Sequence, residues 1–242
     1  MLDFTFDGIR ILNNDIVSNR PKIAIQLRDD NKFLALSDTA LFKLFIEPLL
    51  PSATIRNISF SEPSVRFIPA AINTQGENKA VVEFNPDFLK DGSYRLVVSA
   101  RDASGNQSGN VNYSIQFKVI TKQSISHILP YPNPFSTSTR FAYTLTGDTP
   151  PQYMTIQIMT VSGKVVREIT QNELGSLRIG THLTDYAWDG KDDFGSPLAN
   201  GVYLYRVITK DRNKQKIDRY ENSDSNLDLY FKKDCGKIVI MR

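Results

Sequence analysis

The stretch Leu198-Ala199-Asn200-Gly201-Val202-Tyr203-Leu204-Tyr205 decides the fold class predicted for this chain. Asn-Gly is a turn signal, and the run that follows it has the pattern of a strand. Because successive side chains of a strand point to opposite faces, either the two tyrosines or Val202 and Leu204 must face a core. Similar runs, each bounded by Gly, Pro, Asn, Asp or Ser, recur along the chain. We therefore predict an all-β protein built of antiparallel strands and short turns.

The alternating runs fall into two halves that do not align as repeats. The strands predicted in the first half are 23–27, 81–84, 94–100 and 113–119. Residues 41–46 are assigned to a further strand rather than to a short helix, because Pro48 and Pro51 would end a helix early. The strands predicted in the second half are 140–145, 155–160, 165–169, 184–188, 202–209, 229–231 and 237–241. Such a series of short strands is typical of an immunoglobulin-like sandwich.

The boundary between the halves is predicted near residue 123. Residues 122–127 are polar and precede Pro130, Pro132 and Pro134. Proline fixes φ and donates no hydrogen bond to a ladder, so this stretch is either an extended linker or the entry to a new edge strand. We predict two tandem immunoglobulin-like β-sandwich domains, at 1–122 and 126–242.

Composition and charge exclude several classes of protein. The 29 basic and 26 acidic residues give a net charge of +3 and are spread along the chain, which argues against a nucleic-acid partner. No apolar run is long enough to span a bilayer, and the first eight residues do not resemble a signal peptide. If the protein is exported, we expect its signal to lie upstream. The single cysteine, Cys235, leaves no internal disulfide, and no catalytic residue is assigned.

The loop at 188–195, Trp-Asp-Gly-Lys-Asp-Asp-Phe-Gly, holds the candidate metal ligands. Asp189, Asp192 and Asp193 place three hard oxygen ligands close together, although the EF-hand spacing is absent. The favoured interpretation is a turn-rich loop whose carboxylates bond nearby amides, and a bound calcium ion is the alternative. No other cofactor is expected. Trp188 is predicted to be a core aromatic whose indole needs one hydrogen-bond partner.

Four segments of the second half together resemble a known module: Tyr131-Pro132-Asn133-Pro134-Phe135, Trp188-Asp189-Gly190, residues 198–205 and residues 237–242. The module is the FlgD-like immunoglobulin-type domain at the C-terminus of large exported Bacteroidetes proteins, including those that leave through the type IX secretion system. The hairpin at 161–164, with Gly163, fits it. In the first half, residues 100–109 are similar to a turn common in bacterial immunoglobulin-like repeats. The order of the two domains also looks like the tail of gingipain-type cysteine peptidases and their sortase-like relatives.

This resemblance implies the non-catalytic C-terminal region of a secreted or cell-surface protein that passes through the periplasm. The terminal module would be recognised by the secretion machinery or by outer-membrane surface proteins, and the first domain would space it from an upstream domain. The residues expected to carry this recognition are Lys237, Ile238, Val239, Ile240, Asn200, Gly201 and Tyr203. They would act through exposed strand edges and hairpin tips, where backbone groups are open to a partner.

Two alternatives stay open. A carbohydrate-binding or adhesion module would need a row of exposed aromatic side chains on one face, drawn from Tyr131, Tyr153, Tyr203, Tyr205, Tyr220 and Tyr230. A substrate-binding accessory domain of an upstream cysteine peptidase would instead use a surface of the first domain. The polar segment at 210–226 is interpreted as a solvated loop.

Overall fold

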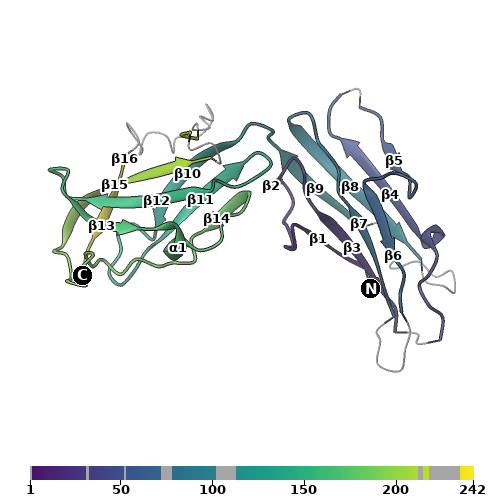
Figure 1. The fold of residues 1–242 in the computed structure, drawn as a ribbon, viewed down its shortest axis with the longest axis horizontal. Coiled ribbons are helices and arrows are strands. Elements are labelled where there is room, and N and C mark those ends of the chain that lie inside the picture. The colour runs from purple at the N-terminus through teal and green to yellow at the C-terminus, as the bar shows by residue number, and fades with distance from the viewer. Residues whose placement is uncertain are drawn as a thin grey trace. The chain divides into compact units, whose positions relative to one another are not determined.

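The chain divides into two compact units, residues 1–121 and 122–242, and each is described by itself (Figure 1). The computed structural model describes residues 2–30, 33–51, 53–71, 78–101, 113–211, 215–217 and 235–242. Both units are built from β-strands, as the alternating sequence predicts. Within these described residues, none of the helices has the length and hydrophobicity needed to cross a bilayer.

Unit 1 is a sandwich of two sheets. Its strands are β1 Leu2–Phe6, β2 Asp15–Val17, β3 Ile23–Arg28, β4 Phe42–Pro48, β5 Arg56–Ile58, β6 Val65–Ile68, β7 Lys79–Phe84, β8 Gly92–Ala100 and β9 Tyr113–Val119. One sheet has the order β1-β3-β7-β6 and the other has the order β2-β9-β8-β4-β5. The strand assignment of residues 41–46 is confirmed: β4 follows a 3-10 turn, Thr39–Leu41, and Phe42, Leu44 and Ile46 are all buried.

Alternate residues of the unit 1 strands fill one core. In β8, for example, Leu96 and Val98 are fully buried while the residues between them are partly exposed. An aromatic group closes one side of this core, where Phe117 contacts Phe6, Phe88 and Tyr94 at ring-centroid distances of 5.1, 5.5 and 6.0 Å. The immunoglobulin-like turn expected at 100–109 lies almost entirely outside the described residues.

Unit 2 is a second sandwich. Its strands are β10 Ser124–Tyr131, β11 Arg140–Thr146, β12 Tyr153–Met159, β13 Val165–Ile169, β14 Gly180–Leu183, β15 Gly201–Lys210 and β16 Cys235–Ile240, and a single helical turn, α1 Gln171–Leu174, follows β13. A three-stranded sheet has the order β10-β11-β14, and a four-stranded sheet has the order β13-β12-β15-β16. Side chains from both sheets form the core, in which Trp188, Tyr205 and Phe141 are fully buried.

Several local predictions for unit 2 are confirmed. Gly163 occupies the β12–β13 hairpin at a φ of 88°, a value that favours glycine. Trp188 is 0% exposed, and its indole Nε1 donates to the Lys191 carbonyl at 2.9 Å, which supplies the one partner it needs. Of the two interpretations of the proline-rich entry, the edge strand is correct, since β10 forms one edge of the three-stranded sheet.

One strand prediction is wrong and another cannot be followed. Residues 184–188 do not form a strand; the pairing with β11 is made by Gly180–Leu183 instead. The chain turns at Thr184, whose hydroxyl accepts from the Phe141 amide at 3.1 Å and donates to the Tyr186 carbonyl at 3.0 Å. Trp188 keeps only an isolated bridge to Thr139. The predicted strand 229–231, and most of the polar segment 210–226, lie outside the described residues.

Candidate functional site

The structure brings the two predicted recognition segments side by side, as neighbouring strands of one sheet. β16 pairs antiparallel with β15, so that Gly201 faces Ile240, Tyr203 faces Ile238 and Leu204 faces Lys237. Asn200 directly precedes this ladder. All seven predicted residues therefore lie at one end of the four-stranded sheet.

Alternation along β16 separates the predicted residues into two groups. Ile238 and Ile240 are 0% and 1% exposed and belong to the core of unit 2. Lys237 is exposed and Val239 is partly exposed, on the opposite face of the sheet. Tyr203 is partly buried against the core, and its hydroxyl donates to the Ala199 carbonyl at 3.0 Å. Of the predicted residues on β16, Lys237 and Val239 are therefore the two whose side chains are accessible to a partner.

The outer edge of β16 is closed by the Asn133–Phe135 segment. The Asn133 side chain donates through Nδ2 to the Lys237 carbonyl at 3.0 Å, and its Oδ1 accepts from the Val239 amide at 2.9 Å. The Phe135 amide donates to the Val239 carbonyl at 3.0 Å, and the Met241 amide donates to the Phe135 carbonyl at 2.8 Å. The edge-addition mechanism expected from the sequence therefore does not fit residues 237–241, because the backbone groups that a partner strand would use are occupied.

Arg242 anchors the end of the same strand. Its guanidinium donates to the carbonyls of Leu198 and Asp189 at 2.9 and 2.8 Å, and more weakly to that of Gly190. Its backbone exchanges two hydrogen bonds with the Asn200 side chain, each at 3.0 Å. Asn200, predicted to meet a partner, thus binds the terminal strand itself. We call Asn133, Phe135, Asn200 and Arg242, with the carbonyls that hold Arg242, the terminal-strand clasp.

The opposite edge of the sheet is closed in a similar way by Asp193. Its amide donates to the Val166 carbonyl of β13 at 3.0 Å, and its Oδ1 accepts from the Glu168 amide at 3.1 Å. The same carboxylate pairs with Arg167 at 2.9 Å. Arg167 also bonds Glu173 and lies 5.7 Å from the ring centroid of Tyr186. Asp193 therefore acts as a one-residue substitute for a neighbouring strand.

The three aspartates proposed as calcium ligands are engaged separately. Asp189 pairs with Lys191 at 2.6 Å; partial burial alone would raise its pKa, but the Lys191 hydrogen bonds and charge lower it. Asp192 Oδ1 accepts from the Phe194 and Ser196 amides at 3.0 and 2.8 Å, which closes a turn. In the described part of the chain, no group of three or more His, Cys, Asp or Glu side chains is arranged to hold a metal ion. The loop fits the favoured interpretation of a turn.

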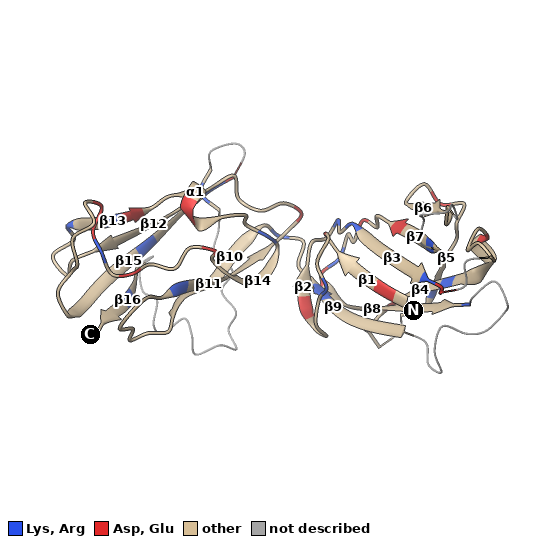
Figure 2. Ribbon diagram, turned by 90° about the horizontal axis from the view of Figure 1, so that it is seen from below, with Lys and Arg blue, Asp and Glu red and all other residues tan. Residues whose placement is uncertain are grey.

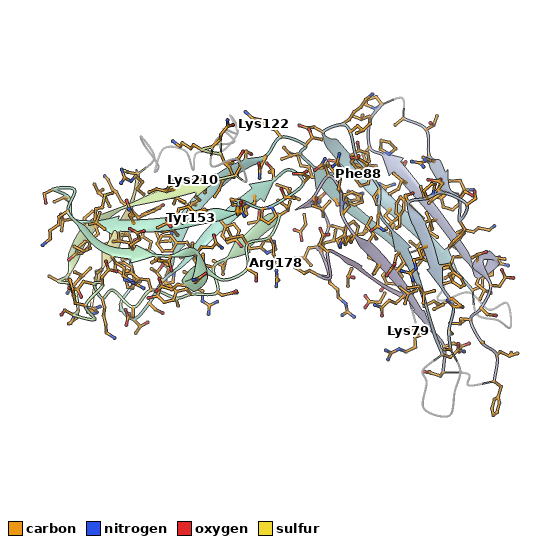
Figure 3. The ribbon with its side chains drawn as sticks, viewed as in Figure 1. Lys79, Phe88, Lys122, Tyr153, Arg178 and Lys210 are labelled. Carbon is orange, nitrogen blue, oxygen red and sulfur yellow. The ribbon has the colours of Figure 1, made fainter. Side chains whose placement is uncertain are left out.

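The tyrosines considered for a carbohydrate platform do not share one face. Tyr205 is 1% exposed, and Tyr203 packs against the same core. Tyr131 is exposed on β10 of one sheet, whereas Tyr153 is exposed on β12 of the other. In Figure 3, Tyr153 lies beside Lys210, whose Nζ is 5.8 Å from its ring centroid. Tyr220 and Tyr230 lie outside the described residues.

Sequence reasoning missed the role of three residues in this site. Asn133 belongs to the quoted Pro-Asn-Pro motif, but its contact with a strand 104 residues later has no local signal. Asp193 was predicted to bond nearby amides of its own loop or to bind a metal, not to close a strand edge, and Arg242 was considered only as the end of a strand. An Asn between two prolines was the available clue, because such a side chain can replace backbone hydrogen bonds that the prolines cannot make.

Comparisons with known proteins agree with this description of unit 2. Residues 133–213 match the family model of the FlgD Ig-like domain. No curated protein is detectably similar to the chain in sequence. The match includes Asn133, the hairpin of Gly163, the 188–195 loop and all of β15, but not β16.

Similar solved structures share very little sequence with the chain. Dimeric latent PorU from Porphyromonas gingivalis is 16% identical over 99% of this chain and 20% of that chain, with a TM-score of 0.36. The fibronectin(III)-like modules of CbhA from Clostridium thermocellum are 14% identical over 98% and 94% of the two chains, with a TM-score of 0.25. The chain thus spans a fifth of the length of that PorU chain. Residues 133–213 of this all-β protein are thus similar to the FlgD Ig-like domain.

Proposed function

We propose that this chain is the non-catalytic C-terminal region of an exported bacterial protein, in which unit 2 is recognised for export or surface attachment and unit 1 is a spacer. The partner is the secretion machinery or an outer-membrane surface protein. The upstream part of the polypeptide would be a gingipain-type cysteine peptidase. The protein would cross the periplasm and end outside the cell or on its surface.

The observation that carries this proposal is the way β16 is presented. Ile238 and Ile240 anchor the strand in the core, while the clasp fixes its outer edge and its end. Lys237 and Val239 are then displayed on a rigid strand rather than on a loose tail. A preorganised surface loses little conformational entropy when it binds, which suits recognition of a folded module. The FlgD Ig-like match over 133–213 supports the same assignment.

An export assay tests the proposal directly. Residues 1–242 are fused behind a signal peptide and a fluorescent reporter, and expressed in a type IX-competent bacterium and in a matched strain that lacks the secretion system. We expect reporter at the surface or in the medium only in the competent strain. Retention in the periplasm of both strains would contradict the proposed function.

Paired variants then separate recognition from folding. The double variant Lys237→Ser with Val239→Ser changes two outward side chains and leaves Ile238 and Ile240 in place. Its control, Arg178→Ser with Leu183→Ser, removes one exposed cation and one exposed apolar side chain near the other sheet. We expect the first to lower export and the control to leave it unchanged. Equal export of the two would remove the terminal strand from the recognition site.

A further inference from the structure

Both edges of the four-stranded sheet of unit 2 are bonded to other segments of the chain, so a partner of this sheet would meet its outer face. Asp193 occupies the β13 edge, and Asn133 with Phe135 occupies the β16 edge. The register fixes which side chains point away from the core. Met154, Ile156 and Ile158 of β12 and Tyr205 and Val207 of β15 are in the core, so Gln157 and Arg206, which alternate with them, point to the outer face. Thr155 has the same orientation but is fully buried.

Part of this outer face is apolar and runs across all four strands. Val165 of β13 faces Met159, Met159 faces Leu204, and Val202 of β15 faces Val239 of β16. Met159, which lies between Val165 and Leu204, is itself buried at 7% exposure, although it is not part of the core cluster. Val165 and Val202 are 40% and 47% exposed. We call Val165, Met159, Leu204, Val202 and Val239 the outer patch.

A polar row bounds the outer patch. Glu168, Gln157 and Arg206 are register partners on neighbouring strands. Gln157 Nε2 donates to Glu168 at 3.0 Å, and Arg206 donates to Gln157 Oε1 at 2.7 Å. An apolar area with a hydrogen-bonded polar border has the organisation of a protein interface, in which a dry centre is surrounded by a wet rim.

Charge on the same face is unbalanced and indicates the chemistry of the partner. Arg206, Lys210 and Lys237 point outward from β15 and β16, and Glu168 is the carboxylate that opposes them among the described residues of this face. Unit 2 otherwise carries both signs interspersed (Figure 2). A partner that presents carboxylates beside an apolar area would be complementary to three cations and one anion.

We propose that the outer patch and its cations bind an acidic protein surface, which is the partner that recognises unit 2 under the proposed function. A second copy of this chain fits less well, because a two-fold contact of this face would bring the same cations together. A membrane also fits less well, because interfacial surfaces are rich in aromatic side chains, whereas the outer patch contains none and Tyr153, beside Lys210, is the aromatic side chain that the described strands place on this face.

Recognition of the outer face requires residues far from the end of the chain, whereas a signal made only of the last residues does not. Val165→Ser with Val202→Ser alters the outer patch while leaving the sequence of residues 237–242 unchanged. Lys210→Glu with Lys237→Glu reverses two of the three cations. The matched controls are Leu183→Ser with Tyr131→Ser, both exposed on the other sheet, and Arg140→Glu with Arg178→Glu. All are made in the reporter fusion of residues 1–242, and unchanged unfolding midpoints verify that they fold.

We expect both outer-face variants to lower export by at least about tenfold, which corresponds to about 1.4 kcal/mol of lost binding, and both controls to behave as wild type. Normal export of the Val165→Ser with Val202→Ser variant would overturn the proposal. Cosedimentation of the wild-type chain with vesicles of phosphatidylcholine and phosphatidylglycerol, lost in the same variant, would also overturn it, in favour of a membrane partner.

A second readout keeps the proposal testable if the wild-type fusion is not exported, a result that would reject the proposed function. A photo-crosslinking amino acid at Val202 is then used in intact cells. A discrete protein adduct that disappears in the Lys210→Glu with Lys237→Glu background, but persists with Arg140→Glu and Arg178→Glu, supports the outer face as an acidic-protein site. The absence of an adduct, or an adduct insensitive to charge reversal, overturns it.

Discussion

Gly236 in β16 provides the sharpest test of how the terminal strand is held. It is the register partner of Tyr205, whose ring covers it so closely that a Cβ at this position would overlap the Tyr205 Cζ, hydroxyl and Cε1 atoms. Tyr205 has little freedom to move, because it is 1% exposed and its hydroxyl donates to the Ile128 carbonyl at 2.7 Å. Its ring also packs edge-on against Phe141 at 5.4 Å. Gly236→Ala must therefore displace a buried, hydrogen-bonded ring.

The expected cost has two parts. Overpacking a core costs about 1–3 kcal/mol, and breaking a buried hydrogen bond adds about 1–3 kcal/mol. We therefore expect Gly236→Ala to lower the free energy of unfolding of unit 2 by about 3 kcal/mol. With a urea dependence of about 1–3 kcal/mol per molar for a domain of this size, the midpoint falls by about 1–3 M.

The single tryptophan of the chain makes this loss measurable in the intact protein. Trp188 is in the core of unit 2, so its fluorescence reports the unfolding of that unit alone. Lys237→Ala, at the exposed neighbouring position, serves as control and should change stability by no more than about 0.5 kcal/mol. Tyr205→Leu should cost less in the Gly236→Ala background than in the wild type. Additive costs, or an unchanged midpoint for Gly236→Ala, would refute the steric argument.

Three further predictions use the same fluorescence assay. Asn133→Ala removes two hydrogen bonds to β16 and should cost about 1–2 kcal/mol, whereas Asn133→Asp keeps the acceptor for the Val239 amide and should cost less; equal costs would contradict the edge-closing role. Thr155 Oγ1 is buried and has no hydrogen-bond partner among the residues that the structure describes, so Thr155→Val should be neutral or stabilising by up to about 1 kcal/mol, and a clear loss of stability would contradict this. Partial burial alone would raise the pKa of Glu173, but hydrogen bonds from Thr170 and Arg167 outweigh burial and lower the pKa. The stability that Glu173 contributes is therefore present above its unfolded pKa of about 4.3 and is lost as the pH falls through the folded value. Glu173→Gln should make the stability of unit 2 fall less steeply at acid pH, and an unchanged pH dependence would exclude this carboxylate as its source.

Local sequence rules predicted those parts of the fold that depend on local chemistry. Alternation located β3, β8, β9, β11 and β13, and a glycine in a short polar stretch located the β12–β13 hairpin. The shift from residues 184–188 to Gly180–Leu183 was not predictable in this way, because it depends on the hydrogen bonds of Thr184 with Phe141 and Tyr186. The helical turn α1 depends on a capping box between Thr170 and Glu173, which is too short a signal to notice beside longer alternating runs.

The candidate site also depends on contacts between residues that are distant in sequence. These contacts change the proposed mode of recognition from strand addition at an edge to binding at the outer face. Alternation indicates that a segment is a strand, but whether its edge is open depends on residues elsewhere in the chain. The β16 edge is closed by Asn133, which is 106 residues from Val239, and the β13 edge by Asp193, which is 25 residues from Glu168. Natural proteins close sheet edges to prevent uncontrolled strand addition. Since both edges are bonded in this way, the recognition that we propose for this sheet would use its outer face, where Val165 and Val202 are exposed.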